Sequence, residues 1–454
     1  MKKALARVAL YVGLAALLLI PLYPGLAYVN GRFADAAASA ELASGAELPA
    51  TLRIVYHHLR RGWYRSTFEA NVAVDAGAAP GLGQDALITV RGVIHHGPVA
   101  GFGCFGVART DITVDLSDAV RRTLKSAFGD DDPLVLSVCS GYFGGRTVTL
   151  SSPKFRAPLD VGTGTLDSAG FRFVQHLPQG GASITADGGL PRLTFVRPNG
   201  DRAELTGLTI TSRQTRVQGS LYDGEARCAI AELSATTAGG KTEGRVTGLD
   251  SRVQSKSLDG TMNYRYSVAV GAVQTPTLSL QSAVVDLSFN HLDIAALNRF
   301  ADTLAAQNKD TSLSHEARAA AVREALGTLF RDLMAKAPEL RLERAALQGE
   351  AGRAEIKGAV RLPGLDLGDL ALPLAAMKKA DGEFEVYVDD GALKYLPGGA
   401  AALEAELAAL ATDGAVRRES GRTTTTLRLR GGEVTLNDRP FGAPLGQRPV
   451  SGPP

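Results

Sequence analysis

The sequence predicts an α+β fold: a predominantly antiparallel, curved β-sheet packed with a few amphipathic helices and preceded by one N-terminal transmembrane helix. Three observations lead to this prediction. Segments between Leu52 and Phe289 alternate apolar with polar residues and are separated by Gly, Pro, Asp and Asn clusters, as in an antiparallel meander with one buried face. Helical spacing of apolar residues returns at Asp293. A long uncharged segment stands near the start of the chain.

The uncharged segment runs from Val8 to Val29 and follows three basic residues within Met1–Arg7. Roughly 20 apolar residues span the hydrocarbon core of a bilayer, and basic residues before such a helix keep the N-terminus in the cytoplasm. We therefore expect a membrane anchor followed by an exported body. The side chains expected to form the anchor include Val8, Leu14, Leu18, Ile20, Leu22, Leu26 and Val29. A cleaved signal peptide is the alternative, because Gly25-Leu-Ala27 resembles a cleavage site.

The body begins with a short helix predicted over Phe33–Leu48 and ended by Pro49. The alternating segments Leu52–His57 and Phe68–Val74 come next and are expected to pair as a hairpin. The following segments, as far as Phe289, continue the sheet.

Helices are predicted after the meander. Asp293 is a candidate cap for the first, and a second runs from Ser314 to Lys336 with an apolar stripe that we expect to dock on the open face of the sheet. A third covers Ala400–Ala411, and Gly431-Gly432 predicts a tight hairpin near the end.

These elements divide the chain into five parts. They are a cytoplasmic stub and anchor (1–31), a β-rich body (32–292), a helical segment docking on the sheet (293–340), a C-terminal β/α part of the same body (341–440) and a disordered tail (441–454).

Charge and cysteine content restrict the classes of function. The formal net charge is +2, and acidic and basic residues are interspersed, so the sequence predicts no nucleic-acid partner. There are three cysteines, too few for a disulfide scaffold. Two interpretations stay open: three buried, unpaired thiols, or one disulfide closed in an oxidising compartment, for which Cys104 and Cys139 are the chosen pair because they lie in neighbouring strand-like segments.

Sequence patterns that resemble binding motifs have simpler interpretations. His57-His58 and His95-His96 provide imidazoles, but adjacent strand residues point to opposite faces, so we interpret them as turn or strand-end histidines and predict no metal site. The spacing of Gly101–Gly106 matches a dinucleotide loop but precedes a strand-like segment rather than a helix. The sequence contains no familiar hydrolase, nucleotide or metalloprotease motif, so we expect neither cofactor nor catalysis.

Trp63 is the single tryptophan and lies among Arg60, Arg61 and Arg65. It could rest on phospholipid headgroups. The preferred interpretation is structural: a hairpin bend whose tryptophan seals the end of the sheet.

Several short blocks of this sequence resemble the YdgA-like family of Gram-negative bacterial envelope proteins, a family defined as a domain of unknown function. These blocks are the N-terminal apolar segment, Tyr56 with Arg61-Gly62-Trp63, His96-Gly97-Pro98, Leu292–Leu297 and Gly432–Pro440. The resemblance implies a single-pass inner-membrane protein with its body in the periplasm, and it transfers no catalytic residues.

The sequence therefore favours a non-enzymatic, membrane-anchored periplasmic protein. Its sheet would present a surface or groove to an envelope lipid or similar apolar ligand. A protein-interaction module or self-associating scaffold, which would make the chain a homo-oligomer, is the alternative, and a hydrolase without a recognisable motif is the third.

Overall fold

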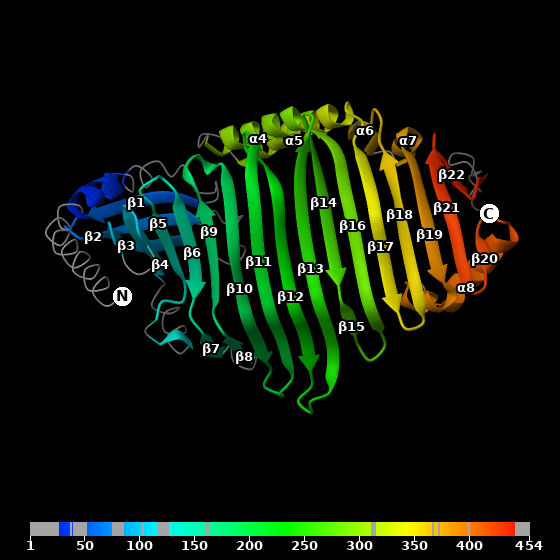
Figure 1. Cartoon of the computed structure of the whole chain (residues 1–454), viewed down its shortest axis with the longest axis horizontal. Helices are drawn as coiled ribbons and strands as arrows, with labels where there is room; N and C mark the ends of the chain where they lie inside the picture. The colour runs from blue at the N-terminus through cyan, green and yellow to red at the C-terminus, as the bar shows by residue number, and fades with distance from the viewer. Residues whose placement is uncertain are drawn as a thin grey trace, which may run out of the picture. The chain divides into compact units, whose positions relative to one another are not determined.

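The computed structural model describes residues 27–36, 39, 52–74, 86–100, 104–115, 127–129, 131–158, 164–309, 315–365, 367–370, 373–396 and 400–440. The chain divides into two compact units, which are described separately. Unit 1 comprises Met1–Leu159 and Leu166–Gly189, and unit 2 comprises Asp160–Thr165 and Leu190–Pro454. Both units consist mostly of antiparallel strands with a few helices, which confirms the predicted α+β class (Figure 1).

Unit 1 begins with a helix at residues 27–36 and continues as an antiparallel ladder. Its strands are β1 (Leu52–Arg60), β2 (Arg65–Val74), β3 (Ala86–His96), β4 (Ala108–Asp115), β5 (Val135–Ser140), β6 (Arg146–Ser152), β7 (Phe155–Pro158), β8 (Thr165–Ser168) and β9 (Phe171–Leu177). Pairing follows the chain from β1 to β6, and β9 pairs with β6. The predicted first hairpin is therefore present. A short 3-10 turn, η1 (Gln179–Gly181), leads into β10 (Ser183–Val196).

Cys104 and Cys139 form a disulfide, the pair that the sequence favours. Cys139 lies in β5, directly opposite Arg109 of β4, and Cys104 lies just before β4 begins. The bond therefore ties the segment entering β4 to the neighbouring strand. Cys228 is unpaired.

Unit 2 is a second antiparallel ladder of long strands. They are β11 (Arg202–Gln218), β12 (Leu221–Thr236), β13 (Thr242–Leu258), β14 (Thr261–Val270), β15 (Ala272–Gln274), β16 (Ser279–Asp293), β17 (Glu339–Gly349), β18 (Gly352–Arg361), β19 (Asp381–Asp389), β20 (Arg417–Glu419), β21 (Arg422–Arg430), β22 (Glu433–Leu436) and β23 (Arg439–Pro440). Neighbours in the chain pair in turn, except that β14 pairs with β16, short β15 lies between β13 and β16, and β19 pairs with β21. Gly431 and Gly432 both have positive φ in the predicted hairpin between β21 and β22.

The helices of unit 2 interrupt this ladder. They are α4 (Ile294–Lys309), α5 (His315–Met334), α6 (Leu367–Leu370), α7 (Pro373–Lys379), the 3-10 turn η2 (Asp390–Tyr395) and α8 (Ala400–Thr412). Asp293 caps α4 as predicted, because its Oδ1 accepts a hydrogen bond from the Ala296 amide at 2.7 Å.

The second predicted helix, α5, was expected to dock on the open face of the sheet, and in the structure it contacts the sheet at β16. In Figure 1, α4 and α5 run along one end of the long strands, and they contact each other more than the sheet. An ion pair of 2.7 Å between Arg299 and Asp332 joins them. Helix α5 therefore packs mainly along α4, with contacts to the sheet at β16, and Leu326 on α5 is exposed.

The well-buried residues of unit 2 lie toward the two ends of its strands. At one end, Met262 of β14 packs where α4 begins, near Ile294 and Ala296. At the other end, a cluster that includes Ala354 and Val388 is covered by η2 and α8. The middle of the strands lies between these two cores.

No helix within the described residues is long and apolar enough to cross a membrane. The expected anchor residues Val8, Leu14, Leu18, Ile20, Leu22 and Leu26 lie outside the described residues. Val29 lies in the helix at residues 27–36, where its side chain is exposed.

Candidate functional site

The middle of the unit 2 sheet presents one apolar face. Residues paired across neighbouring strands point to the same side, so the register of the strands identifies rows of side chains that share a face. Three such rows cross β12, β13, β14, β16, β17, β18 and β19. The first is Cys228, Ser251, Val268, Val285, Ala345, Ile356 and Val386; the second is Ala226, Val253, Tyr266, Leu287, Leu342, Gly358 and Phe384; the third is Gly224, Ser255, Tyr264, Phe289, Leu340, Val360 and Gly382.

We term these rows the apolar face. Apart from Val386, which packs against the cluster under η2 and α8, they are not covered by the described part of the chain. Val253, Tyr266, Val285 and Phe289 are 39–44% exposed, and Gly382 is the one row member that is buried. A sheet face packed against a second layer would bury most of its side chains. The row members instead keep the partial exposure that neighbouring side chains on one open sheet produce.

The dimensions of the apolar face suit a lipid chain. Seven strands at about 4.8 Å spacing give a width of about 30 Å across the sheet, and three rows extend about 14 Å along the strands. One leaflet of a bilayer has a hydrocarbon thickness of roughly 15 Å, half of the whole core. The uncovered area is at least about 400 Å². Soluble proteins rarely leave larger contiguous apolar patches in water unless they bind something.

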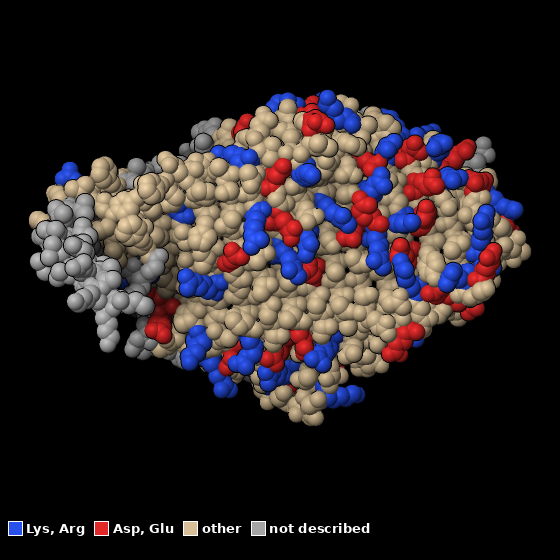
Figure 2. Space-filling model, viewed as in Figure 1, with Lys and Arg blue, Asp and Glu red and all other residues tan. Residues whose placement is uncertain are grey.

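The opposite face of the same sheet is charged. One row there comprises Arg213, Glu225, Gln254, Arg265, Ser288, Arg341, Ala359, Glu383 and Arg428. Figure 2 shows acidic and basic side chains interspersed over these strands. Many pair across strands, for example Arg252 with Glu225 at 3.3 Å and Lys357 with Glu385 at 2.9 Å. Such exposed pairs contribute at most about 1 kcal/mol each, so this face is a solvated surface.

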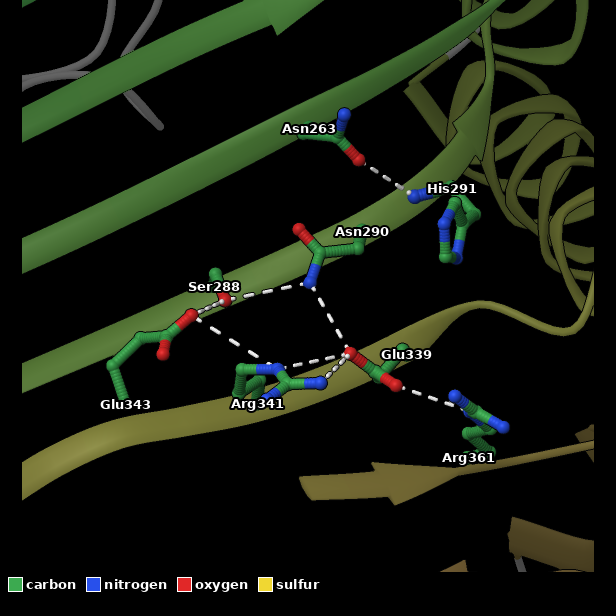
Figure 3. A network of polar contacts seen from close by, with 8 residues as sticks. All are labelled: Asn263, Ser288, Asn290, His291, Glu339, Arg341, Glu343 and Arg361. Carbon is green, nitrogen blue, oxygen red and sulfur yellow. Dashed lines mark hydrogen bonds and ion pairs between the residues drawn. The ribbon is translucent and has the colours of Figure 1, made fainter. Parts of the chain in front are cut away.

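The most buried carboxylate on the charged face belongs to Glu339 (Figure 3). Its Oε1 accepts hydrogen bonds from Arg341 at 2.9 Å and Asn290 at 3.4 Å, and its Oε2 accepts one from Arg361 at 3.0 Å. Burial alone raises the pKa of Glu339, but the hydrogen bonds from the two arginines outweigh it and hold the pKa below its ordinary value. This network joins β16, β17 and β18, which is a structural role.

Two shallow cavities of about 530 and 750 Å³ lie over the C-terminal strands of unit 2. The larger is lined by Glu339, Arg341, Arg361, Asp381, Glu383, Arg428, Arg430, Glu433 and Asp438 among others. Acidic and basic groups are nearly balanced and pair with one another, so the cavity has no strong preference for the charge of a ligand.

In unit 1, the structure brings together two blocks that the sequence analysis singled out. Strand β2 follows the turn at Gly62-Trp63, and β3 ends at His96, and their register places Arg65 opposite His95. The His96 amide donates a hydrogen bond to the Tyr64 carbonyl at 2.9 Å. Tyr56 pairs with Asn71 in the β1–β2 ladder, and its side chain lies outside the described part of the chain.

The imidazole of His96 is the centre of this cluster and is 3% exposed. Its Nδ1 lies 3.0 Å from the Trp63 carbonyl, and because a carbonyl can only accept, Nδ1 carries the proton. In the neutral ring, Nε2 then accepts a hydrogen bond from Ser66 Oγ at 3.1 Å. The Asp35 carboxylate, from the helix at residues 27–36, lies 3.8 Å from the same Nε2.

Serine, histidine and aspartate in this cluster do not form a hydrolase triad. In such a triad, the carboxylate orients the histidine through the nitrogen that does not face the serine. Here Ser66 and Asp35 both approach Nε2, and the other nitrogen bonds to a backbone carbonyl. Ser66 is 1% exposed, so a substrate cannot reach its hydroxyl. The arrangement instead fixes the helix and the turn against β3.

Glycines in the two blocks allow close backbone approach. A Cβ at Gly97 would stand 1.7 Å from the Gly106 carbonyl oxygen, and the Gly97 amide donates to the Val107 carbonyl at 2.7 Å. A Cβ at Gly62 would stand 2.3 Å from the Arg65 carbonyl oxygen. The Gly97–Pro98 peptide bond is cis. Arg61 is exposed, with Nε 3.8 Å from the Asp35 carboxylate.

Trp63 does not seal the end of the sheet, which corrects the preferred interpretation from the sequence. It lies in the predicted bend, but its side chain is 66% exposed, and its ring is in tilted contact with Tyr28 of the helix at residues 27–36, with ring centroids 5.3 Å apart. Sequence reasoning missed Asp35 and Gly31, because one charged and one small residue in an alanine-rich segment give no signal of a long-range partner.

The histidines expected at turns and strand ends are dispersed. His57 and His58 are exposed in β1, and His95 Nε2 lies 3.5 Å from Asp111. Within the described residues, no group of three or more His, Cys, Asp or Glu side chains could hold a metal ion.

Fold and surface together define a class: an antiparallel β-sheet protein whose main sheet is charged on one face, whereas the other face is apolar and largely uncovered by the described residues. The chain belongs to the family described as "Bacterial protein of unknown function (DUF945)", whose model matches residues 1–444. No curated protein and no solved structure matches the sequence.

Proposed function

We propose that this chain is a periplasmic protein, anchored in the bacterial inner membrane by residues 8–29, that binds an envelope phospholipid through the apolar face of unit 2. The observation that carries the proposal is the set of three cross-strand apolar rows left uncovered between the two buried ends of the sheet. Acyl chains lying across the rows would remove this surface from water at about 25 cal/mol per Å². The role is binding without catalysis.

Three further observations support the location. The uncharged segment Val8–Val29 follows basic residues, as an anchor with a cytoplasmic N-terminus does. The disulfide between Cys104 and Cys139 suits an oxidising compartment such as the periplasm. The family is bacterial. Protease added to spheroplasts should degrade the body; a body protected from the protease would contradict the location.

Site-specific photocrosslinking in the full-length protein tests the ligand. A photoreactive phenylalanine in place of Val253 would report on the apolar face, and the same residue in place of Gln254 would report on the charged face one position along β13. We expect phospholipid adducts, identified by mass spectrometry, at residue 253 and not at residue 254. Equal adducts at both positions, or none at residue 253, would overturn the proposal.

A second copy of the chain is the competing occupant, because it too could cover the apolar face. Crosslinked dimers formed through residue 253, without lipid adducts, would favour the self-associating scaffold. Native mass spectrometry of the detergent-purified protein distinguishes the two occupants, because a dimer and a monomer with bound lipid differ in mass.

A further inference from the structure

The helix at residues 27–36 exposes its large apolar side chains and buries small and polar ones. Its buried positions carry Ala27, Asn30, Gly31 and Asp35, and its exposed positions include Tyr28, Val29, Arg32 and Phe33. A helix on the surface of a soluble protein buries its large apolar residues and exposes its polar ones. The outward face of this helix is therefore suited to an apolar neighbour.

Aromatic side chains from other segments of unit 1 lie beside the helix. The rings of Tyr28 and Trp63 are in tilted contact, with centroids 5.3 Å apart. Asn30 donates a hydrogen bond to the Tyr142 hydroxyl at 3.0 Å, and Tyr142 packs edge-on against Phe105 at 5.6 Å. Four aromatic side chains of unit 1 are strongly exposed: Phe33 (68%), Trp63 (66%), Phe105 (74%) and Phe143 (88%). We term these four residues and Tyr28 the aromatic surface.

The helix that carries part of this surface is firmly held. Gly31 packs on the His96 ring, and Asp35 is buried beside His96 and Arg61. Tyr28 and Phe33 therefore keep fixed positions relative to Trp63. A rigid set of exposed aromatic rings does not need to be ordered when it meets a partner, which lowers the entropic cost of binding.

The position of the helix in the chain identifies the partner. The uncharged segment Val8–Val29 ends inside this helix, so a chain leaving a bilayer would place residues 27–36 at its surface. Trp and Tyr concentrate at the membrane interface, and Arg32 and Arg61 beside them suit lipid phosphates. We infer that the aromatic surface of unit 1 is seated in the interface of the bilayer that holds the anchor. This inference rests on the anchoring part of the proposed function and is independent of the ligand of unit 2.

Trp63 is the chain's single tryptophan, so its fluorescence reports on this surface alone. The full-length protein would be reconstituted in vesicles of phosphatidylethanolamine and phosphatidylglycerol, with or without bromine on the upper part of the acyl chains. We expect Trp63 to emit at a shorter wavelength than in the protein unfolded by denaturant without detergent. We also expect brominated lipid to quench its fluorescence and the bilayer to protect it from aqueous acrylamide. Acrylamide quenching without bromolipid quenching would overturn the inference. Protection from both quenchers would also overturn it and would indicate a protein neighbour.

Two variants control the experiment. Phe33→Asp changes an exposed residue of the aromatic surface and should reduce the bromolipid quenching of Trp63, whereas Leu326→Asp, at an exposed position of α5, should not. Equal effects of both variants would contradict the inference. Flotation of the same vesicles separates the causes of failure. Protein that does not float lacks the anchor, whereas protein that floats with Trp63 open to acrylamide lacks only the seated surface.

Discussion

Gly31 lies directly against the imidazole of His96, so that a Cβ at residue 31 would stand 2.3 Å from Nδ1 of the histidine. The contact joins the helix at residues 27–36 to the end of β3. The same nitrogen donates a hydrogen bond to the Trp63 carbonyl, so a displaced ring would also disturb the turn before β2. One glycine thus sets the position of three segments of unit 1.

Gly31→Ala should therefore destabilise the docked helix. In an unobstructed helix, this change adds about 0.5–1 kcal/mol of stability, because alanine loses less entropy on folding. Overpacking against buried His96 should reverse the sign and cost about 1–3 kcal/mol. Hydrogen exchange of residues 27–36 would measure the loss of protection. Arg32→Ala, on the exposed side, is the control; unchanged or increased protection in Gly31→Ala would contradict the packing.

Ser66→Ala should destabilise unit 1 by about 1–3 kcal/mol, because it leaves the buried Nε2 of His96 without its hydrogen-bond donor. Urea unfolding followed by Trp63 fluorescence measures the change. Thr67→Ala removes a hydroxyl from the exposed neighbouring position and should have little effect. If the two variants unfold alike, the hydrogen bond to His96 contributes nothing measurable.

Glu339→Gln should remove a pH-dependent part of the stability of unit 2. Burial raises the pKa of Glu339, whereas the hydrogen bonds and charges of its partners, chiefly Arg341 and Arg361, lower it. The lowering effects together are larger, so the pKa in the folded protein lies below the ordinary 4.5. A group with a lowered folded pKa adds stability above its unfolded pKa and loses it as pH falls through the folded pKa. The wild-type free energy of unfolding should therefore decrease as pH falls below 4.5.

Urea unfolding at a series of acidic pH values checks this expectation. Glu339→Gln should be less stable than the wild type at neutral pH and should show a smaller decrease on acidification. Glu343→Gln removes a more exposed carboxylate of the same strand and is the control. If the free energy of unfolding of Glu339→Gln decreased with pH in parallel with that of the wild type, the lowered pKa of Glu339 would be contradicted.

Replacing both Cys104 and Cys139 by serine should destabilise unit 1. The disulfide closes a loop between residues 35 positions apart, and such a bond contributes about 2–4 kcal/mol by restricting the unfolded chain. Thermal unfolding followed by Trp63 fluorescence, with and without reductant, measures the loss. Cys228→Ser removes the free thiol and should leave the transition unchanged. A wild-type transition insensitive to reductant would argue against the bond.

Much of the secondary structure could be predicted from local pattern. Alternation from Leu52 to Phe289 predicted the ladder, Asp293 predicted the start of α4, and Gly431-Gly432 predicted the last tight hairpin. These signals are local because strand alternation, helix capping and positive φ each involve residues that are close in the chain.

Long-range packing could not be predicted in the same way. The apolar stripe of α5 required a partner, but the stripe does not distinguish a sheet face from a neighbouring helix. In the structure α5 lies along α4, and the described residues leave most of the apolar face of the sheet uncovered. Trp63 was likewise expected to seal the end of the sheet, whereas in the structure its side chain is exposed and Ser66 and His96 are buried beside this turn.

The sequence by itself determined that unit 2 would have one apolar and one polar sheet face, because alternation at a period of two residues assigns each side chain to a face. It also determined that an uncharged segment would precede the body. Only the tertiary structure decided that the apolar face stays open and that Gly31, Asp35, Ser66 and His96 meet. Those outcomes depend on which distant segments pack together, and a local pattern does not specify its partner.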